Sequence, residues 1–316
     1  DFPRDRQRAE ALFRIGECSY LLKDLPRAIT DLTAYLKAAP KHNLRNWGQF
    51  YLADALYQRK DYAAAEILFR RSLTEFPKGQ LAEESRFKLA LCCEKTGNVT
   101  AARKLYVVLS GNKSFPFAAR SLSQLGSLEF DAKQFAKAAA VWNQLARLFP
   151  KSPLADTARL NAGYAHFQLG QFPEAVARFQ AARSRADQAA VADYWRGISL
   201  KSLDRTDAAI AAFRQAETGR PDPELARDIQ FQWADSDFRA GRYEAAGKRF
   251  QEIVIRWPRH AGAAQGLLFA TESVLQVATR TQDATLRRRK LDQAQQLVDR
   301  FLRDFRNSPL FSKHQL

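Results

Sequence analysis

Small and large apolar residues recur along this chain with a period of about 37 residues. The small residues stand at Gly16, Ala53, Ala90, Gly126, Gly163, Gly197 and Ala234. An alanine follows each of them after twelve residues, and a large apolar residue stands four residues beyond that alanine. These pairs are Ala28/Leu32, Ala65/Phe69, Ala102/Tyr106, Ala138/Trp142, Ala175/Phe179, Ala209/Phe213 and Ala246/Phe250. The coincident registers predict a repeat protein in which each unit buries its apolar face only against its neighbours.

Each unit has the pattern of two helices joined by a short turn. In residues 46–77, apolar residues recur at helical intervals over 46–59 and again over 62–75, on either side of the turn at 60–61. Several copies place glycine at this turn, as at Gly97, Gly170 and Gly241, which predicts a left-handed residue at the end of the first helix. Proline closes most units, at Pro40, Pro77, Pro150, Pro221 and Pro258, because it cannot continue the second helix.

The pattern predicts an all-α solenoid of about eight helix-turn-helix repeats. Their expected spans are residues 9–40, 46–77, 83–116, 119–150, 156–187, 190–221, 227–258 and 262–309. The eighth unit is longer, and we expect residues 278–289 to be inserted between its helices. The chain contains no methionine, and its opening Asp1-Phe2-Pro3 matches the repeat ends at 75–77 and 148–150. We therefore expect a single array, 1–316, that is an excerpt of a longer chain.

The order of small residue, turn, alanine, large apolar residue and closing proline resembles the tetratricopeptide-repeat family. The resemblance covers residues 9–309, with seven clear copies and a divergent eighth. Repeat three departs from the pattern with Ser114 at its closing position, and repeat five departs with Asp187. The resemblance implies a right-handed solenoid whose first helices line a concave peptide-binding face.

The amino-acid sequences of two segments, 149–155 and 170–175, are similar to those of tetratricopeptide proteins of the bacterial envelope. Those proteins include the lipoprotein of the outer-membrane β-barrel assembly machinery and the periplasmic partner of the Tol–Pal system. This similarity implies a scaffold in the bacterial periplasm or envelope, in preference to the cytoplasm.

Aromatic residues are the candidate binding residues. Three residues before and four residues after the small residues stand Phe13, Tyr20, Phe50, Tyr57, Phe87, Phe130, Phe167, Tyr194, Phe231 and Phe238. Trp47, Tyr51, Tyr164 and Trp195 are further candidates on the same helices, with the polar residues Arg14, Lys88, Asn161, Gln232 and Asp235 alongside. Two interpretations remain open: the rings pack successive repeats together, or they anchor a protein or peptide in a groove, as aromatic hot-spot residues do.

Charge suggests an alternative ligand. The net charge is +16, which favours acidic partners, and the densest basic cluster is Arg287, Arg288, Arg289 and Lys290 in the expected insertion. This cluster could bind a polyanion such as RNA, DNA or an anionic envelope surface, or it could be an ordinary solvated face. A pentatricopeptide RNA reader is disfavoured, because the first helices lack the repeating polar pair that base readout needs. A third alternative is an architectural arm of a larger multidomain protein.

Nothing in the sequence predicts catalysis. The four histidines, His42, His166, His260 and His314, are isolated and lack metal-ligand spacing. No phosphate-binding glycine loop or nucleophile motif occurs. We therefore expect no enzyme activity, cofactor or metal, and no apolar run reaches the length of a membrane span. Three cysteines, Cys18, Cys92 and Cys93, do not form a disulfide framework, and a buried position fits Cys18 and Cys92.

Overall fold

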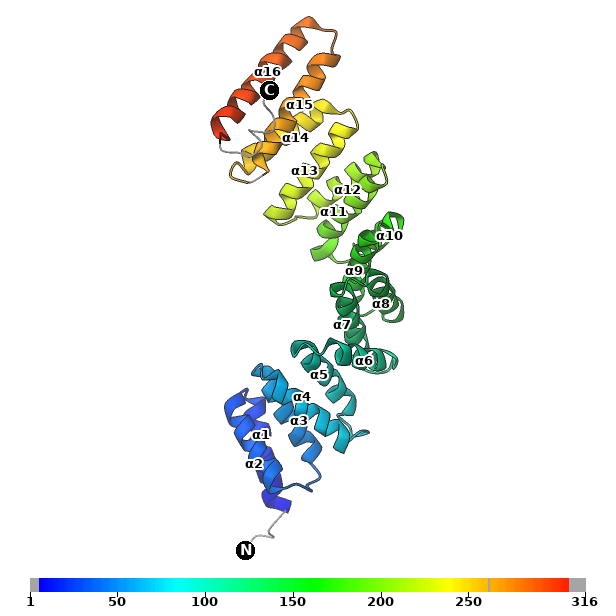
Figure 1. The fold of residues 1–316 in the computed structure, drawn as a ribbon, viewed down its shortest axis with the longest axis vertical. Helices are drawn as coiled ribbons and strands as arrows, with labels where there is room; N and C mark the ends of the chain where they lie inside the picture. Colours follow the sequence, from blue (N-terminus) through cyan, green and yellow to red (C-terminus); the bar gives the residue numbers. More distant parts are fainter. Residues whose placement is uncertain (1–5, 261, 307–316) are drawn as a thin grey trace. The chain divides into compact units, whose positions relative to one another are not determined.

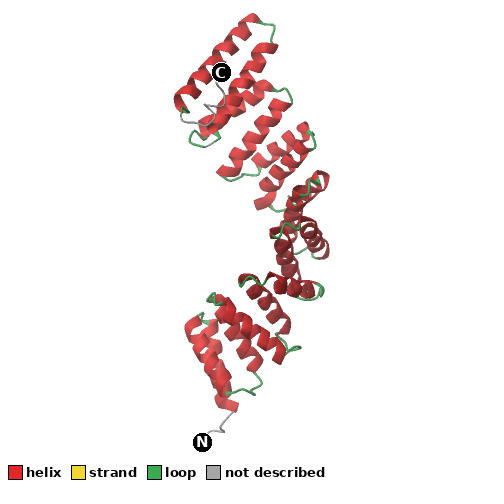
Figure 2. Cartoon of the chain, in the orientation of Figure 1, coloured by secondary structure: helices red, strands yellow, loops and turns green. Residues whose placement is uncertain are grey.

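The computed structural model describes residues 6–260 and 262–306, and all regular structure in these residues is helical (Figures 1 and 2). The helices are α1 (Arg6–Leu21), α2 (Leu25–Ala38), α3 (Arg45–Gln58), α4 (Tyr62–Glu75), α5 (Ala82–Lys95), α6 (Val99–Ser110), α7 (Ala118–Asp131), α8 (Phe135–Leu148), α9 (Ala155–Gln168), α10 (Phe172–Ala181), α11 (Ala186–Ser202), α12 (Thr206–Thr218), α13 (Pro223–Arg239), α14 (Tyr243–Arg256), α15 (Ala263–Arg280) and α16 (Ala284–Asp304). The all-α prediction is confirmed.

The chain divides into two compact units, Asp1–Ala155 and Asp156–Leu316, which we call unit 1 and unit 2. Within unit 1, each of α1 to α7 packs against the helix that follows it. In unit 2, the same holds from α10 to α16. Consecutive first helices also touch in each unit, as α1 touches α3 and α11 touches α13. Each unit is therefore a stack of helical hairpins.

The turns inside the first seven hairpins use the same backbone geometry. The seventh residue after each small residue has a positive φ: Lys23 (61°), Lys60 (67°), Gly97 (82°), Lys133 (57°), Gly170 (71°), Asp204 (57°) and Gly241 (73°). The left-handed residue predicted at the three glycines is confirmed, and three lysines and one aspartate adopt it as well. In three repeats the next residue caps the second helix: Asp24, Asp61 and Asn98 accept hydrogen bonds from backbone N–H groups at 3.2 Å.

The recurring small residues leave room for the large apolar side chain of their own repeat. A Cβ added to Gly163 would lie 2.6 Å from the ring of Phe179, and one added to Gly197 would lie 2.5 Å from the ring of Phe213. Both rings are fully buried. The ring of the second helix therefore lies directly against the small residue of the first helix.

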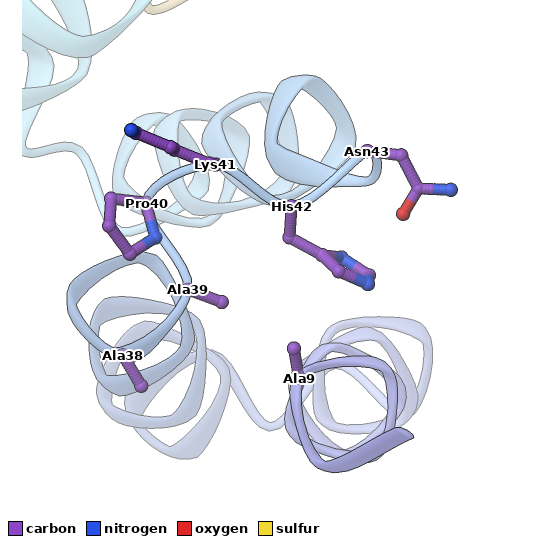
Figure 3. Close-up of a pocket in the computed structure, with 7 residues that line it drawn as sticks. All are labelled: Ala9, Ala38, Ala39, Pro40, Lys41, His42 and Asn43. Atoms are coloured by element: carbon purple, nitrogen blue, oxygen red, sulfur yellow. The ribbon is translucent and has the colours of Figure 1, made fainter. Parts of the chain in front are cut away.

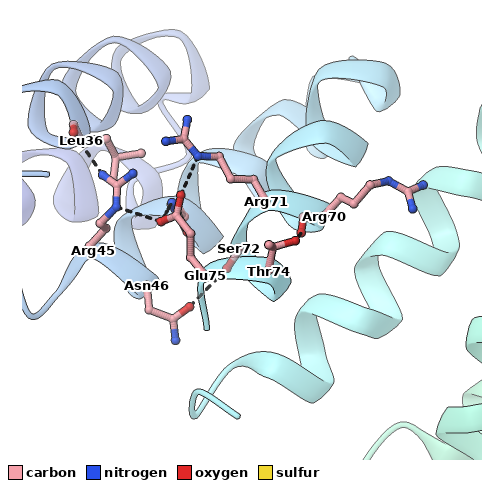
Figure 4. Close-up of polar contacts among 9 residues, drawn as sticks. Leu36, Arg45, Asn46, Arg70, Arg71, Ser72, Thr74 and Glu75 are labelled. Atoms are coloured by element: carbon pink, nitrogen blue, oxygen red, sulfur yellow. Dashed lines mark hydrogen bonds and ion pairs between the residues drawn. The ribbon is translucent and has the colours of Figure 1, made fainter. Parts of the chain in front are cut away.

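Polar contacts join successive repeats in unit 1 (Figure 4). Glu75, at the end of α4, accepts hydrogen bonds from Arg71 (2.7 Å), Arg45 (3.0 Å) and Gln49 (2.8 Å), and Arg45 also donates to the carbonyl of Leu36 at 3.2 Å. Burial alone would raise the pKa of Glu75, but these donors hold the pKa at about 2. The carboxylate therefore ties α3 and α4 to the end of α2.

The eighth hairpin differs from the prediction. Its extra residues do not form a long insertion between the helices, because α15 continues to Arg280 and α16 begins at Ala284. Asp283 caps α16 by accepting from the backbone N–H groups of Thr285 and Leu286. The extra length therefore extends both helices. The expected boundary at 187–190 between the fifth and sixth repeats falls inside α11.

Candidate functional site: the first-helix face

Three predicted anchor rings lie in the core. Phe13, Phe50 and Phe87 are at most 5% exposed. Each ring contacts an aromatic ring of the second helix in its own hairpin. The centroid distances are 5.4 Å for Phe13–Tyr35, 5.8 Å for Phe50–Phe69 and 6.2 Å for Phe87–Tyr106. These three rings pack the hairpins and offer no surface to a partner.

The rings four residues after the small residue are half-buried, and most of them close the turn of their hairpin. Each of these contacts the aromatic residue that begins the second helix, five positions later. The pairs are Tyr57–Tyr62 (5.3 Å), Phe130–Phe135 (5.1 Å), Phe167–Phe172 (5.4 Å) and Phe238–Tyr243 (5.1 Å). The recurring spacing of five was visible in the sequence and would have indicated this packing.

The half-buried rings of unit 1 gather around Tyr51 on α3. Its ring centroid lies 4.8 Å from that of Tyr20 on α1 and 5.9 Å from that of Trp47. Tyr20, Trp47 and Tyr51 therefore form an aromatic surface across two first helices. We use the name first-helix face for the surface of the first helices that is formed by half-buried rings, such as Tyr20, Trp47 and Tyr51, and by the polar residues beside them.

A buried carboxylate fixes this face. Asp54 on α3 is 3% exposed and accepts hydrogen bonds from the Tyr20 hydroxyl (2.6 Å) and the Gln58 amide (2.7 Å). Lys88 on α5 forms an ion pair with it at 2.6 Å and lies 5.4 Å from the Tyr57 ring centroid. Asp54 therefore connects three successive first helices. Lys88 is one of the polar residues predicted from the sequence to lie beside the rings, whereas Asp54 has no sequence signal beyond its place directly after Ala53.

The electrostatics of this cluster follow from burial and charge. Burial raises the pKa of Asp54, but the positive charge of Lys88 and the hydrogen bonds outweigh it, so that the pKa lies below its ordinary value. Burial, together with the adjacent carboxylate, raises the pKa of Tyr20. At neutral pH the cluster therefore holds a carboxylate, an ammonium group and a neutral phenol.

Unit 2 carries a second aromatic cluster, centred on Trp195 of α11. Its ring centroid lies 5.3 Å from those of Tyr164 and Phe167 on α9 and 5.7 Å from that of Tyr194. All four rings are half-buried.

An ion pair again joins neighbouring first helices in unit 2. Lys201 on α11 approaches Asp235 on α13 at 2.5 Å and donates to Gln232 at 2.7 Å. Arg239 pairs with Asp235 at 3.0 Å. Asp235 directly follows Ala234, as Asp54 follows Ala53, so the two carboxylates occupy the same place in their repeats. Gln232 and Asp235 are among the polar residues predicted from the sequence to lie beside the rings, and the structure brings them together with Lys201.

A pocket of about 310 Å³ opens in unit 2 between α11, α13 and the loop that precedes α15. It is lined by Tyr194, Arg227, Asp228, Phe231, Gln232, Ile253, His260, Gly262 and Gln265. Burial raises the pKa of Tyr194 to about 12, so its hydroxyl stays neutral. His260 Nδ1 accepts a hydrogen bond from the backbone N–H of Gly262 at 3.0 Å, which leaves Nε2 as the donor of the neutral ring. The pocket thus combines apolar walls with several polar groups, and two predicted anchors, Tyr194 and Phe231, line it.

A second pocket, of about 520 Å³, lies in unit 1 between the start of α1 and the loop after α2 (Figure 3). Its walls are Ala9, Ala38, Ala39, Pro40, Lys41, His42 and Asn43. The His42 Nδ1 is engaged by the Tyr35 hydroxyl at 2.9 Å. This pocket contains none of the predicted anchors and lies apart from the first-helix face of unit 1.

The basic cluster Arg287–Lys290 lies in the first two turns of α16, and the expectation of a loop location is wrong. Arg287 donates to the carbonyl of Thr281 at 2.8 Å, and Lys290 pairs with Glu244 at 3.4 Å. Two of the four cations are therefore engaged within the protein.

The described residues contain no group of three possible metal ligands, and none of their helices is long and apolar enough to cross a membrane. His314 lies outside the residues that the structure describes.

The stacked hairpins define the chain as a helical-repeat solenoid, and sequence comparisons identify the repeat. Two tetratricopeptide-repeat family profiles match residues 10–42 and 48–80. A third profile, "T7SS, ESX-1 secretion system protein EccA1, N-terminal domain", matches residues 125–240. A "TPR repeat-containing protein" of Treponema pallidum (strain Nichols) is 28% identical over 104 residues, which cover 33% of this chain and 44% of that protein. The match thus spans less than half of that relative.

Solved structures agree on the fold. The C-terminal part of a tetratricopeptide protein from Cytophaga hutchinsonii has a TM-score of 0.66 at 15% identity, covering 81% of this chain and 99% of that one. A tetratricopeptide protein from Parabacteroides merdae has a TM-score of 0.52 at 16% identity, covering 84% and 99%. The Naa15/Naa10 complex bound to HypK matches with a TM-score of 0.55 at 15% identity, covering 96% of this chain and 43% of that one. Two segments of the chain match tetratricopeptide-repeat profiles and its fold matches tetratricopeptide-repeat structures, which confirms the predicted resemblance to that family.

Proposed function

We propose that this protein is an interaction scaffold that binds a segment of a partner protein on its first-helix face. Tetratricopeptide arrays commonly mediate protein–protein interaction and are generally non-enzymatic. The observation that carries the proposal is the pocket of unit 2, in which Tyr194 and Phe231 lie beside polar side chains. Its volume of about 310 Å³ is at the small end of ligand pockets, which suits one or two side chains of a bound segment.

The composition of the pocket indicates what kind of side chain it accepts. The aromatic walls favour an apolar or aromatic residue, and the His260 ring and Gln232 amide provide hydrogen bonds to the backbone of the segment. Fixed rings on the first helices lower the cost of ordering the site on binding. The basic cluster on α16 does not favour the polyanion alternative, because two of its four side chains already have partners in the protein.

The test uses a variant that fills the pocket without disturbing the core. Gln265 is exposed on the rim of the pocket, so Gln265→Trp is expected to leave stability unchanged and to occlude the site. Thr279→Trp is the matched control, because Thr279 is exposed on the same helix about 21 Å further along its axis. A partner is first captured from nuclease-treated extract of the source cells, and its Kd is then measured with each variant.

We expect Gln265→Trp to weaken binding at least tenfold and Thr279→Trp to leave the Kd unchanged. Unchanged affinity for Gln265→Trp would show that the partner binds elsewhere and would refute this pocket as its site.

A further inference from the structure

The loops that lead from one repeat to the next carry a recurring positive charge. In unit 1 these inter-repeat loops are residues 39–44, 76–81, 111–117 and 149–154. Each contains one lysine: Lys41, Lys78, Lys113 and Lys151. All four are exposed, and none forms a hydrogen bond or ion pair with another described side chain. We call these four residues the lysine row.

The lysine row has no neutralising charge in its own loops, since none of the four loops contains an aspartate or glutamate. The turns inside the hairpins differ, because Lys23 and Lys60 are each followed directly by an aspartate, Asp24 and Asp61. Figure 3 shows the first loop, where the Lys41 side chain extends away from Ala9 while the His42 ring points toward it. The row is therefore a set of free cations, one in each inter-repeat loop of unit 1.

Three arginines near these loops are already engaged. Arg45 and Arg71 bind Glu75 (Figure 4), and Arg86 donates to the carbonyl of Pro77 at 2.8 Å. Each inter-repeat loop of unit 1 carries one such unpaired lysine. In unit 2, Arg259 repeats the feature in the loop before α15, whereas the loop before α13 holds Asp222 as well as Arg220.

The spacing of the row favours a protein segment over nucleic acid. In unit 1 the first helix α3 touches both α1 and α5, so the loops that lead into neighbouring first helices lie about one helix-packing distance apart, on the order of 10 Å. Three residues of an extended chain span about the same length, at ~3.3–3.6 Å per residue. A nucleic-acid strand carries phosphates much more densely, about one per 3.4 Å of duplex axis per strand. The aromatic rings in these loops are buried or half-buried, so they offer no open face for base stacking.

We propose that the lysine row binds an extended acidic segment of a partner protein, with a carboxylate facing each loop at about every third residue. This proposal rests on the proposed function, since the partner is a protein, but it uses a different surface from the first-helix face. Such a row would accelerate association with an acidic partner and would select against basic ones.

The test uses a dye-labelled 20-residue polyglutamate, which self-repulsion keeps extended at neutral pH. Its affinity for the full chain is measured by fluorescence anisotropy at 50 and 200 mM salt. The row variant carries Lys→Gln at 41, 78, 113 and 151. The matched control removes the same charge from four exposed lysines that form no hydrogen bond or ion pair with a described side chain, on other parts of unit 1: Lys60, Lys95, Lys104 and Lys137. Thermal melts confirm that both variants fold, as expected for exposed positions.

We expect the row variant to lose about tenfold or more in affinity at 50 mM salt and the control to lose less than about threefold, with both differences shrinking at 200 mM. Equal losses in the two variants would overturn the proposal, because binding would then follow net charge alone. Tighter binding of a 20-nucleotide oligo(dT) that also depends on the row would overturn the choice of a protein partner.

The two proposals fail separately. If the row variant keeps wild-type affinity for polyglutamate while Gln265→Trp abolishes binding of the captured partner, the lysine row is refuted and the proposed function stands. If the row variant loses affinity for polyglutamate and Gln265→Trp leaves partner binding intact, the pocket of the proposed function is refuted and the lysine row stands.

Discussion

The contact between Gly163 and Phe179 predicts that adding one methyl group will destabilise the protein. A Cβ at Gly163 would lie 2.6, 2.7 and 3.0 Å from three atoms of the Phe179 ring, which is fully buried. Overpacking of this kind costs about 1–3 kcal/mol. Alanine in place of glycine inside a helix returns about 0.5–1 kcal/mol. The expected net effect of Gly163→Ala is a loss of about 0.5–2 kcal/mol in the free energy of unfolding.

Gly266 provides the matched control, because it is also helical but has space around it. A Cβ there would meet Val254 at 3.4 Å and the Phe250 carbonyl oxygen at 3.8 Å, which are ordinary contact distances. Gly266→Ala should therefore stabilise the protein by about 0.5–1 kcal/mol. Guanidinium denaturation followed by far-ultraviolet circular dichroism measures both variants. A Gly163→Ala protein at least as stable as wild type would refute the steric reasoning, as would a shift of the same sign in both variants.

Three further predictions concern stability and reactivity. Because the pKa of Glu75 is held at about 2, its contribution to stability is present above about pH 4.5 and is lost as the pH falls toward 2. In denaturation experiments, the free energy of unfolding of Glu75→Gln should lie about 1–2 kcal/mol below that of wild type at neutral pH and should converge with it near pH 2. A difference in free energy that does not change with pH would contradict this. Cys18 is exposed, whereas burial raises the pKa of Cys92 to about 12. A thiol reagent should therefore label Cys18 in the folded protein and Cys92 only after unfolding, as followed by mass spectrometry. Rapid labelling of Cys92 in the folded protein would contradict its buried packing. Ala175 is fully buried, so Ala175→Leu should cost roughly 1–3 kcal/mol, and an unchanged thermal melt would rule out a tight helix contact there.

The repeat register made the fold predictable, because three residue classes at fixed offsets specify where each hairpin begins, turns and ends. The position of a residue within the repeat also predicts turn geometry that the residue type alone does not indicate. Lys60 and Lys133 adopt the same left-handed turn as Gly97, although lysine alone does not indicate it. The eighth hairpin was predicted less well. Its additional residues continue the helical pattern without an interrupting glycine or proline, and this continuity indicates longer helices instead of an insertion.

The candidate site was predictable in part, because burial in a solenoid depends on the neighbouring hairpin. Phe50 and Tyr51 are adjacent aromatic residues on α3, yet Phe50 is 5% exposed against Phe69 while Tyr51 is half-buried beside Tyr20. Adjacent helical residues differ by about 100° in direction, so one ring meets the second helix and the other lies on the first-helix face. The sequence placed both on α3, but the packing partner that separates them lies elsewhere in the chain.

The two ion pairs on the first-helix faces bear on the proposed function, because they hold together helices that carry aromatic residues. Asp54 and Asp235 occupy the same place in their repeats, but Asp54 pairs with a lysine of the following repeat and Asp235 with a lysine of the preceding one. In unit 2 the pair joins two first helices that both carry half-buried rings, whereas in unit 1 only α3 of the two paired helices carries them, since Phe87 on α5 is buried. A partner segment bound at these faces, as proposed, would meet rings on helices that are already joined within a unit, and little conformational entropy would remain to be lost on binding. This pre-organisation supports the proposal that the face binds a protein segment, since packing alone requires no charged groups between the helices.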